Sequence, residues 1–543
     1  RWNMFDLAIC LGIYSYLIFF LGILHLLYMP AVLITTLGYF LIAAALFKNR
    51  LRNLFKLQSV DKLITQLKDN KLFSLILLTI LIQTVVNLVG VLGPEISFDA
   101  LWYHLTLPKL YILNHAIFHI AGSNLFYSDM PKLTEMLYTA AMILGNDTFA
   151  KLIHFSFGIL ILVAIYKLSR KFLSRDFSIL ASAIFYANLV VGWETITAYI
   201  DLSWAFFTLM AFWGLLLLLE KRTNQRLVLT GIMFGLVVTV KLVALFALPV
   251  FLAILLYDKH QNKDSWVNFV KKSSVIIVIA LLVPLPWFVF AFINTVNPFY
   301  PYFTNQLVDS GKTLVLPNFK YILIDAYNFF LRLNDPISPI YLIVLPLIVF
   351  GFKKFSVKIK YVAIYSFFNL LIWYLTQEQR GGRFILPYLP VFSILAAYVI
   401  EKLKLRNLRN FLVAVVILLS IVSIGYRAVA NAKFVPVVLG KETKSQFLSK
   451  YLNFSFGDFY DTDNYFREHL TKNDTVLLYG FGKLYYVDFK FIDSSWVKKG
   501  DKFNYIAVQN GALLHRFSDW QQIYYNSLTK VRLYTKGGKM CVY

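Results

Sequence analysis

Thirteen apolar runs constrain the fold of this chain more than any other feature of its sequence. They lie at about 5–28, 31–47, 72–93, 148–166, 177–193, 202–219, 227–240, 242–257, 273–293, 340–352, 361–376, 384–400 and 411–428. A helix needs about 20 apolar residues to cross a bilayer, so most runs are long enough, although 227–240 and 340–352 are short. Hydrophobic residues make up 59% of the chain and charged residues 15%, which is too apolar for an ordinary soluble protein. The sequence therefore predicts an α-helical polytopic membrane protein with about 13 transmembrane helices.

The basic residues are distributed unevenly over the connections, and this distribution predicts the orientation. If the N-terminus is cytoplasmic, the inner connections contain 26 Lys and Arg residues and the outer ones contain 8. Cytoplasmic loops of membrane proteins carry the excess of basic residues, and an odd number of spans then places the C-terminal region outside. The net charge of +24 could suggest nucleic acid, but the basic residues sit in short clusters between apolar runs, where they report membrane orientation, so nucleic-acid binding is not expected. Cys10 and Cys541 form no plausible disulfide framework or metal site.

Residues 94–146 lie between two apolar runs, yet they contain acids, histidines, prolines and many aromatic residues. A simple connector does not need this composition, so we expect an external loop folded onto the membrane surface. Asp99 directly follows a span, and Tyr103 and His104 come next at the level of the lipid headgroups. The Asp99 carboxylate is therefore either a functional group at the membrane boundary or the cap of a helix that begins after Phe98.

Further acids occur in this loop and in the next external link. Pro131 fits the first turn of a helix that Asp129 or Ser128 would cap, which favours a structural role for Asp129 and leaves the role of Glu135 open. Asp201 ends a short external link just ahead of a span. Acids that converge from two loops could act as a general base or bind a divalent cation, but sequence spacing does not establish convergence.

Three cations lie on the outer side, where cations are scarce in this chain. Lys241 interrupts an apolar stretch near its middle, and Arg380 and Arg383 precede the run at 384–400. Arg binds phosphate oxygens in a fork, and Lys binds them as a point charge. We therefore favour binding of a lipid phosphate over snorkelling or ordinary headgroup contact.

Histidines and aromatic residues add weaker signals. Four histidines lack the spacing of metal ligands, and each is interpreted first as a hydrogen-bonded interfacial side chain: His104, His115, His119 and His154. The rigid segment 297–302 contains two prolines, and it could wall a sugar or lipid site or simply turn the chain sharply. Tyr103 and Tyr300, together with His104, remain candidates for substrate contact.

The composition changes sharply at about residue 430, where charged and polar residues return. Three segments are expected as strands between helical stretches: 475–482, 505–509 and 531–534. Gly480-Phe481-Gly482 matches a nucleotide-binding turn only in part, because the third glycine and the trailing acid are missing. We therefore expect a transmembrane domain at 1–430, which includes the loop 94–146, and an external α/β domain at 431–543.

Several of these segments together resemble bacterial membrane glycosyltransferases of the GT-C superfamily, in the branch similar to protein O-mannosyltransferases and the lipid A aminoarabinose transferase. The resemblance covers roughly residues 5–430, and the segments that carry it are 98–105, 131–138, 199–201, 297–301 and 383–387. It implies transfer of a sugar from a polyprenyl-phosphate carrier to an acceptor on the outer side of the membrane, usually with inversion at the anomeric carbon.

The resemblance also implies roles for individual residues. Asp99 corresponds to the base that deprotonates the acceptor hydroxyl, and Lys241 with Arg380 or Arg383 corresponds to the cations near the donor phosphate. Glu135 and Asp201 are then supporting acids, completing the catalytic set. Ala100 follows Asp99 where the protein mannosyltransferases have a second acid, so a divalent metal is not favoured and no other cofactor is expected.

The main hypothesis is thus an inverting glycosyltransferase in the bacterial cytoplasmic (inner) membrane, part of the cell-envelope machinery, with an extracytoplasmic site and a glycan, lipid or protein acceptor. The first rival is a flippase or transporter for a lipid-linked or anionic solute, which predicts duplicated halves and membrane-centred acids. Neither is evident in the sequence. The second rival is a scaffold or receptor, which leaves the folded first loop unexplained.

Overall fold

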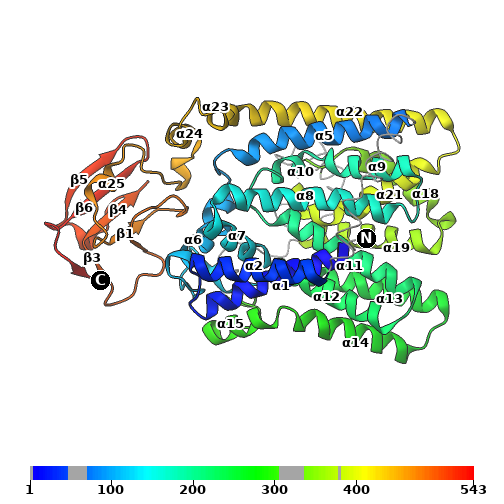
Figure 1. The fold of residues 1–543 in the computed structure, drawn as a ribbon, viewed down its shortest axis with the longest axis horizontal. Helices are drawn as coiled ribbons and strands as arrows, with labels where there is room; N and C mark the ends of the chain where they lie inside the picture. The colour runs from blue at the N-terminus through cyan, green and yellow to red at the C-terminus, as the bar shows by residue number, and fades with distance from the viewer. Residues whose placement is uncertain (1–3, 47–69, 305–323, 325–335, 377–380) are drawn as a thin grey trace.

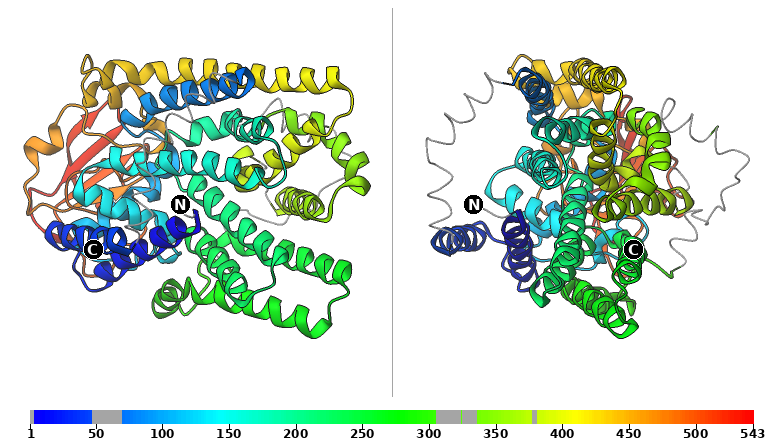
Figure 2. Two further views of the ribbon diagram at one scale, coloured as in Figure 1. Left: turned by 45° about the vertical axis from the view of Figure 1, so that its right-hand side comes forward. Right: turned by 90° about the vertical axis from the view of Figure 1, so that its right-hand side faces the viewer.

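The computed structural model describes residues 4–46, 70–304, 324, 336–376 and 381–543. The molecule is elongated, with a bundle of helices and a small sheet domain at one end of the bundle (Figure 1). Turned by 90°, the helices are seen nearly along their axes, with the sheet domain behind them (Figure 2). This architecture confirms the predicted fold class.

Each predicted apolar run contains a helix. The first half of the bundle comprises α1 (Met4–Ile23), α2 (Met29–Leu46), α5 (Lys71–Leu92), α8 (Asp147–Ser169), α9 (Arg175–Tyr186), α10 (Leu189–Glu194) and α11 (Asp201–Glu220). The second half comprises α12 (Asn224–Val240), η3 (Leu242–Ala247), α13 (Leu248–Asn262), α14 (Trp266–Leu282), α15 (Leu285–Thr295), α18 (Ile340–Gly351), α19 (Val357–Thr376), α20 (Gly382–Ile385), η7 (Leu386–Tyr388), α21 (Leu389–Glu401) and α22 (Arg406–Asn431). Within the described residues, eight helices are long and apolar enough to cross a membrane alone, and the bent pair α14–α15 makes a ninth.

Two of the predicted spans are interrupted rather than straight. Between α14 and α15 the helix axis bends by 60°, and Pro284 and Pro286 lie at the junction. Proline removes a backbone donor and its ring clashes with the preceding turn, so a bend is expected there. The run at 177–193 breaks at Asn188, whose side-chain amide donates to the carbonyls of Ile184 and Phe185. These amide contacts give additional donors to carbonyls in the last turn of α9, where the helix ends.

Helix α11 forms the centre of the bundle. Nearly all of its residues are buried, which agrees with a sequence that is apolar on every face, because such a helix must be surrounded by others. Asp201 is the first residue of α11 and is fully buried. The amino end of a helix carries partial positive charge, so it is a favourable place for a buried carboxylate.

The loop 94–146 is folded, as predicted. It contains the π-helical turn η1 (Ala100–His104), α6 (Thr106–Leu113), the short η2 (Phe126–Asp129) and α7 (Leu133–Leu144). Helices α6 and α7 lie between the bundle and the sheet domain (Figure 1). The loop therefore forms a layer at the end of the bundle where the C-terminal domain is attached.

The predicted cap at Asp129 or Ser128 is wrong, although the structural role of Asp129 is confirmed. Helix α7 begins after Lys132 without a side-chain cap. The fully buried Asp129 carboxylate instead accepts hydrogen bonds from His119 Nδ1 at 2.7 Å and from Asn294 Nδ2 at 3.2 Å. Since Asn294 belongs to α15, Asp129 ties the loop to the bundle.

The C-terminal domain is built on a mixed five-stranded sheet with the order β2-β1-β4-β6-β5. Its strands are β1 (Val476–Tyr479), β2 (Phe491–Asp493), β4 (Tyr505–Gln509), β5 (Gln521–Asn526) and β6 (Val531–Thr535), and β3 (Lys502–Phe503) pairs with β7 (Cys541–Val542) in a small second sheet. Strand β1 pairs in parallel with β2 and β4, and β6 runs antiparallel to β4 and β5. The three segments predicted as strands are confirmed.

The turn at Gly480-Phe481-Gly482 is used for packing inside this domain. Gly480 has φ +78°, and a Cβ there would collide with Gln509 O, so glycine is required. The backbone N–H groups of Gly482 and Lys483 both donate to Gly457 O at 3.0 Å. A phosphate would need these donors, so the turn does not form a nucleotide-binding loop.

The C-terminal domain is held on the folded loop by specific contacts. Lys109 of α6 donates from Nζ to Tyr485 O at 2.6 Å, Val487 O at 2.7 Å and Asp488 Oδ1 at 2.8 Å. The hydroxyl of Tyr486 donates to Glu95 O at 2.8 Å. These bonds fix the domain directly beside the segment that leads to Asp99.

Candidate active site

Asp99 lies where the chain leaves α5 and enters the turn η1. Its carboxylate makes no capping hydrogen bond to that turn, so the capping interpretation is wrong. The backbone N–H of Asp99 donates to Tyr199 Oη at 3.0 Å. Its Oδ2 accepts from Arg383 Nη1 at 2.6 Å and lies 3.4 Å from the hydroxyl of Tyr103. The carboxylate is therefore oriented by side chains rather than by the helix end.

Arg383 joins this carboxylate to a second one. Its Nε donates to Asp201 Oδ2 at 2.9 Å, while Nη1 reaches Asp99. Its guanidinium also lies over the ring of Tyr199, 4.3 Å from the centroid. A planar guanidinium has several donors in a fixed fork, so it can hold two acids in one geometry.

Lys241 binds the other carboxylate oxygen of Asp201. Its ammonium donates to Asp201 Oδ1 at 2.9 Å and lies 4.8 Å from the centre of the Trp204 ring. Lys241 follows the last residue of α12, where the helix ends in an extended residue. Among the described residues Asp201 is its hydrogen-bond partner, and the ammonium also lies 5.8 Å from the centre of the Phe384 ring. We call Asp99, Asp201, Lys241 and Arg383 the charged cluster.

Three members of the charged cluster are partly exposed and one is buried. The side chains of Asp99, Lys241 and Arg383 are 16%, 18% and 14% exposed, whereas that of Asp201 is completely buried. Asp201 thus lies behind the two cations and orients them. The three partly exposed side chains are one carboxylate and two cations.

Glu135, the third predicted acid, lies outside the charged cluster. Its Oε1 is 2.9 Å from His104 Nδ1, and both side chains are almost completely buried. Burial lowers the pKa of the His104 imidazole, and the nearby Glu135 carboxylate offsets this only in part. Burial raises the pKa of Glu135, but the His104 hydrogen bond and the charge of Lys132 outweigh it and leave that pKa below its ordinary value.

The remaining predicted residues have different positions. The ring of Tyr103 stacks on Tyr127, with centroids 4.3 Å apart, beside Asp99. Tyr300 is buried in the turn at 297–302, where Asn297 Nδ2 donates to Tyr302 O at 2.6 Å. Arg380 lies outside the described residues.

The histidines are hydrogen bonded, as expected. His154 Nδ1 lies 2.9 Å from Thr197 O, and its Nε2 accepts the N–H of Leu202 at 3.0 Å. His115 contacts Leu27 O. In the part of the chain that the structure describes, no three His, Cys, Asp or Glu side chains are grouped as metal ligands.

Sequence reasoning missed two residues that complete the site. Glu194 Oε1 lies 3.4 Å from Arg383 Nε, and Glu194 is fully buried at the end of α10. Tyr199 contacts both Asp99 and Arg383. Both residues belong to the external link that ends at Asp201, and Tyr199 lies in the segment 199–201 that carries the family resemblance, but neither was assigned a role.

Comparison with known proteins places this geometry in a wider context. Residues 131–290 match the family model described as dolichyl-phosphate-mannose-protein mannosyltransferase. That segment contains Glu135, Asp201 and Lys241 but neither Asp99 nor Arg383. The chain matches none of the curated protein sequences that were searched.

Solved structures extend the similarity over most of the chain. The structure of ArnT from Cupriavidus metallidurans bound to undecaprenyl phosphate has a TM-score of 0.56 and 11% sequence identity, covering 84% of this chain and 97% of that chain. The apo structure of the same protein has a TM-score of 0.54 and 12% identity, covering 86% and 98%. The apo Archaeoglobus fulgidus oligosaccharyltransferase has a TM-score of 0.47 and 14% identity, covering 79% and 69%, and is too distant to carry an argument. The predicted resemblance to GT-C membrane glycosyltransferases is confirmed at the level of the fold.

Proposed function

We propose that this chain, which has the GT-C glycosyltransferase fold, is an inverting glycosyltransferase that moves a sugar from a polyprenyl-phosphate carrier to an acceptor at the outer face of the membrane. The charged cluster is the observation that carries this proposal. The partly exposed carboxylate of Asp99 pairs with Arg383, and Asp201 joins Arg383 to the second partly exposed cation, Lys241. This is the set of groups that sugar transfer from a lipid phosphate requires.

The cations act on the leaving group. Lys241 and Arg383 bind the phosphate oxygens of the donor and stabilise the negative charge that the phosphate gains as its bond to the sugar breaks. Asp201, which is buried behind them, holds both cations in place. When phosphate oxygens compete for the N–H donors of Arg383, its hydrogen bond to Asp99 weakens.

Asp99 acts on the acceptor. Its carboxylate removes the proton of the acceptor hydroxyl while the hydroxyl oxygen attacks the anomeric carbon and the carrier phosphate leaves with the bonding electrons. Attack on the face opposite the phosphate inverts the anomeric configuration. General-base catalysis of this kind contributes about 10²- to 10⁴-fold.

Glu135 takes a different part in the proposal. Because Glu135 is closed off with His104, it positions the turn that carries Tyr103 beside Asp99 and does not touch substrate. Tyr103 and Tyr300 remain proposed contacts for the sugar or the lipid. The buried imidazole ring of His104 packs against the ring of Tyr103.

The donor and the location rest on two further arguments. The similar ArnT structure contains bound undecaprenyl phosphate, which favours a polyprenyl-phosphate donor here. The bias of basic residues toward the other end of the bundle supports a site on the extracytoplasmic side of the bacterial inner membrane. The acceptor is a glycan, a lipid or a protein that reaches the cluster beside the sheet domain.

The test is transfer of radiolabelled hexoses and pentoses from a panel of polyprenyl-phosphate donors by the purified protein. Asp99→Asn keeps the size of the side chain but removes the base, so we expect transfer to fall by about 10²-fold or more while carrier binding persists. Assays with and without EDTA separate a metal-dependent reaction from one that relies on Lys241 and Arg383. Carrier binding without transfer from any donor would instead favour a flippase.

A further inference from the structure

Five aromatic side chains of the folded loop 94–146 lie together beside Asp99. Their rings form a series of contacts: the centroids of Phe98 and Trp102 are 5.7 Å apart, Trp102 lies 5.3 Å from both Tyr103 and Tyr127, and Phe126 lies 4.0 Å from Tyr127. Phe98 is 49% exposed, and the other four residues are partly exposed. We call these five residues the aromatic patch. Its rings are thus partly accessible to another molecule.

One end of the aromatic patch adjoins the proposed base, and the other end adjoins the sheet domain. The hydroxyl of Tyr103 lies 3.4 Å from Asp99 Oδ2. At the other end, the ammonium of Lys483 lies 4.2 Å from the centre of the Phe98 ring, and Lys483 is itself held by an ion pair with the buried Asp458. A molecule bound along the patch would therefore have Asp99 at one end and the sheet domain at the other.

The rings are held in place by contacts within the protein. Trp102 Nε1 donates to Asn124 O at 2.7 Å, and the Asn124 side-chain amide donates to Phe481 O of the sheet domain at 3.3 Å. The rings of Tyr103 and Tyr127 stack with their centroids 4.3 Å apart. Side chains that are already ordered lose little conformational entropy when a ligand binds, so such a surface favours binding.

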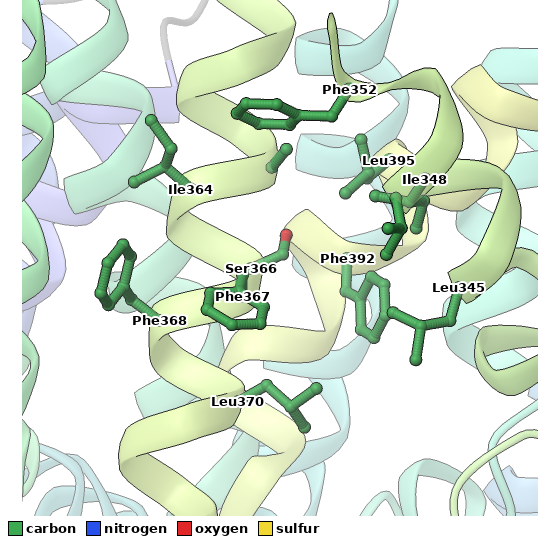
Figure 3. Close-up of a pocket in the computed structure, with 12 residues that line it drawn as sticks. Leu345, Ile348, Phe352, Ile364, Ser366, Phe367, Phe368, Leu370, Phe392 and Leu395 are labelled. Carbon is green, nitrogen blue, oxygen red and sulfur yellow. The ribbon is translucent and has the colours of Figure 1, made fainter.

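A second group of aromatic rings, in an apolar groove between α18, α19 and α21, has a different character (Figure 3). Phe367, Phe368 and Phe392 line this groove, and among its described lining residues Ser366 alone is polar. The Ser366 hydroxyl donates to Val362 O at 2.9 Å within its own helix. The groove therefore suits an apolar molecule, whereas the aromatic patch, which contains tyrosine hydroxyls and adjoins a carboxylate, suits a ligand that is apolar on one side and polar on the other.

We propose that the aromatic patch binds the acceptor and that this acceptor is a saccharide. A sugar ring packs on the exposed ring of Phe98 and on Trp102, and the hydroxyl of the glycan that is to be glycosylated lies at Asp99. The inference rests on the proposed function, in which Asp99 removes the proton of that hydroxyl. It narrows the acceptor from a glycan, a lipid or a protein to a carbohydrate.

The chemistry of the patch distinguishes a saccharide from the other acceptors. A sugar ring carries C–H groups on one face, and these pack on the electron-rich face of an aromatic ring while the hydroxyls of the sugar remain in water. A peptide needs partners for its backbone N–H and C=O groups, but the Trp102 and Asn124 donors at the patch already bond to protein. An acyl chain belongs in the bilayer, whereas Phe98 lies against the ammonium of Lys483.

The experiment changes the exposed ring at Phe98 and varies the acceptor. Each protein receives the donor from which the parent transfers best, together with soluble oligosaccharides of glucose, mannose or N-acetylglucosamine, a peptide rich in serine and threonine, or phosphatidylglycerol. Phe98→Leu keeps an apolar side chain but removes the ring, Phe98→Tyr keeps the ring, and Phe411→Leu makes the same change at an exposed phenylalanine of α22.

For Phe98→Leu we expect KM for the saccharide acceptor to rise about tenfold, equivalent to about 1.4 kcal/mol, because the sugar loses the ring on which it packs. The kcat at saturating acceptor and the donor KM should not change, since the ring binds the acceptor and does not react. Phe98→Tyr and Phe411→Leu should both follow the parent within about twofold.

The outcomes separate this inference from the proposed function. If the parent protein transfers sugar from no donor, either to an acceptor or to water, the proposed function itself is wrong. Transfer to the peptide, the lipid or water, with none to a saccharide, would overturn the inference and leave the use of the donor intact. An unchanged acceptor KM in Phe98→Leu, or an equal rise in Phe98→Tyr, would also overturn it, because the aromatic ring would then not be the binding group.

Discussion

Asp99 and Glu135 are both carboxylates of the folded loop 94–146, and both lie against a cationic or basic side chain. Asp99 meets Arg383 with 16% of its side chain exposed, whereas Glu135 meets His104 with 3% exposed. Asp99 and Arg383 belong to the partly exposed charged cluster, whereas the side chains of Glu135 and His104 are buried. The comparison teaches that residue type and loop position do not separate the acid that we propose as the base from the one that we propose as structural, whereas the exposure of their side chains does.

The sharpest test of this contrast is Arg383→Lys. Lysine keeps the charge but cannot bridge Asp99 and Asp201 as a fork, so both acids lose their common partner. We expect kcat/KM to fall by about 10²- to 10³-fold, the size seen when one preorganised donor is removed from a catalytic site. The measurement is steady-state transfer from the best polyprenyl-phosphate donor.

Arg467→Lys is the matched control, because Arg467 is an exposed arginine of the C-terminal domain. It should leave kcat/KM unchanged within about twofold. If Arg383→Lys retains full activity with unchanged donor KM, the charged cluster is a structural network like the Glu135 pair, and the distinction drawn above fails.

Glu135→Gln tests the buried pair of Glu135 and His104, and it should affect stability more than turnover. A neutral amide can still accept from His104, but it removes a charge-assisted bond from a buried site. We expect a loss of about 1–3 kcal/mol in unfolding free energy, seen as a lower melting temperature in detergent. Activity per folded molecule should change less than about threefold, far below the loss expected for a reacting carboxylate.

Glu468→Gln provides the control for this measurement, since Glu468 is exposed on the sheet domain. A collapse of turnover in Glu135→Gln, at unchanged melting temperature, would move Glu135 into the reaction. The proposed positioning role would then be wrong.

The helical framework could be predicted from the sequence because hydrophobic periods and run lengths act locally along the chain. The bend at Pro284 was visible in principle, since proline in a helix interior breaks the backbone ladder. The break at Asn188 was harder to foresee, because it depends on a side-chain amide that bonds to the helix and also accepts the N–H of Ser338, 150 residues away.

The site shows where local reasoning ends. Asp99, Asp201, Lys241 and Arg383 are separated by up to 284 residues, and no spacing rule brings them together. Their chemical types and their outer-side positions made them candidates, and the family resemblance supplied the roles. The partner of Glu135 could not be read from the sequence either, because the choice between the site and His104 depends on how α7 packs against η1.

The smallest expected effect concerns pH and again separates the closed pair from the open cluster. Burial lowers the pKa of His104 below its ordinary value near 6.5, so the folded protein resists protonation that the unfolded chain accepts. Its contribution to stability is complete above the unfolded pKa and is lost as pH falls through the folded pKa. The pKa of Glu135 is also lowered, but a carboxyl titrates at more acidic pH.

Melting temperatures between pH 7.5 and 5.5 should therefore decline less in His104→Gln than in the parent, while His515→Gln, an exposed histidine variant, should follow the parent. Identical slopes in all three proteins would show that His104 is not protonated on unfolding in this range, and the closed pair would then contribute through packing alone.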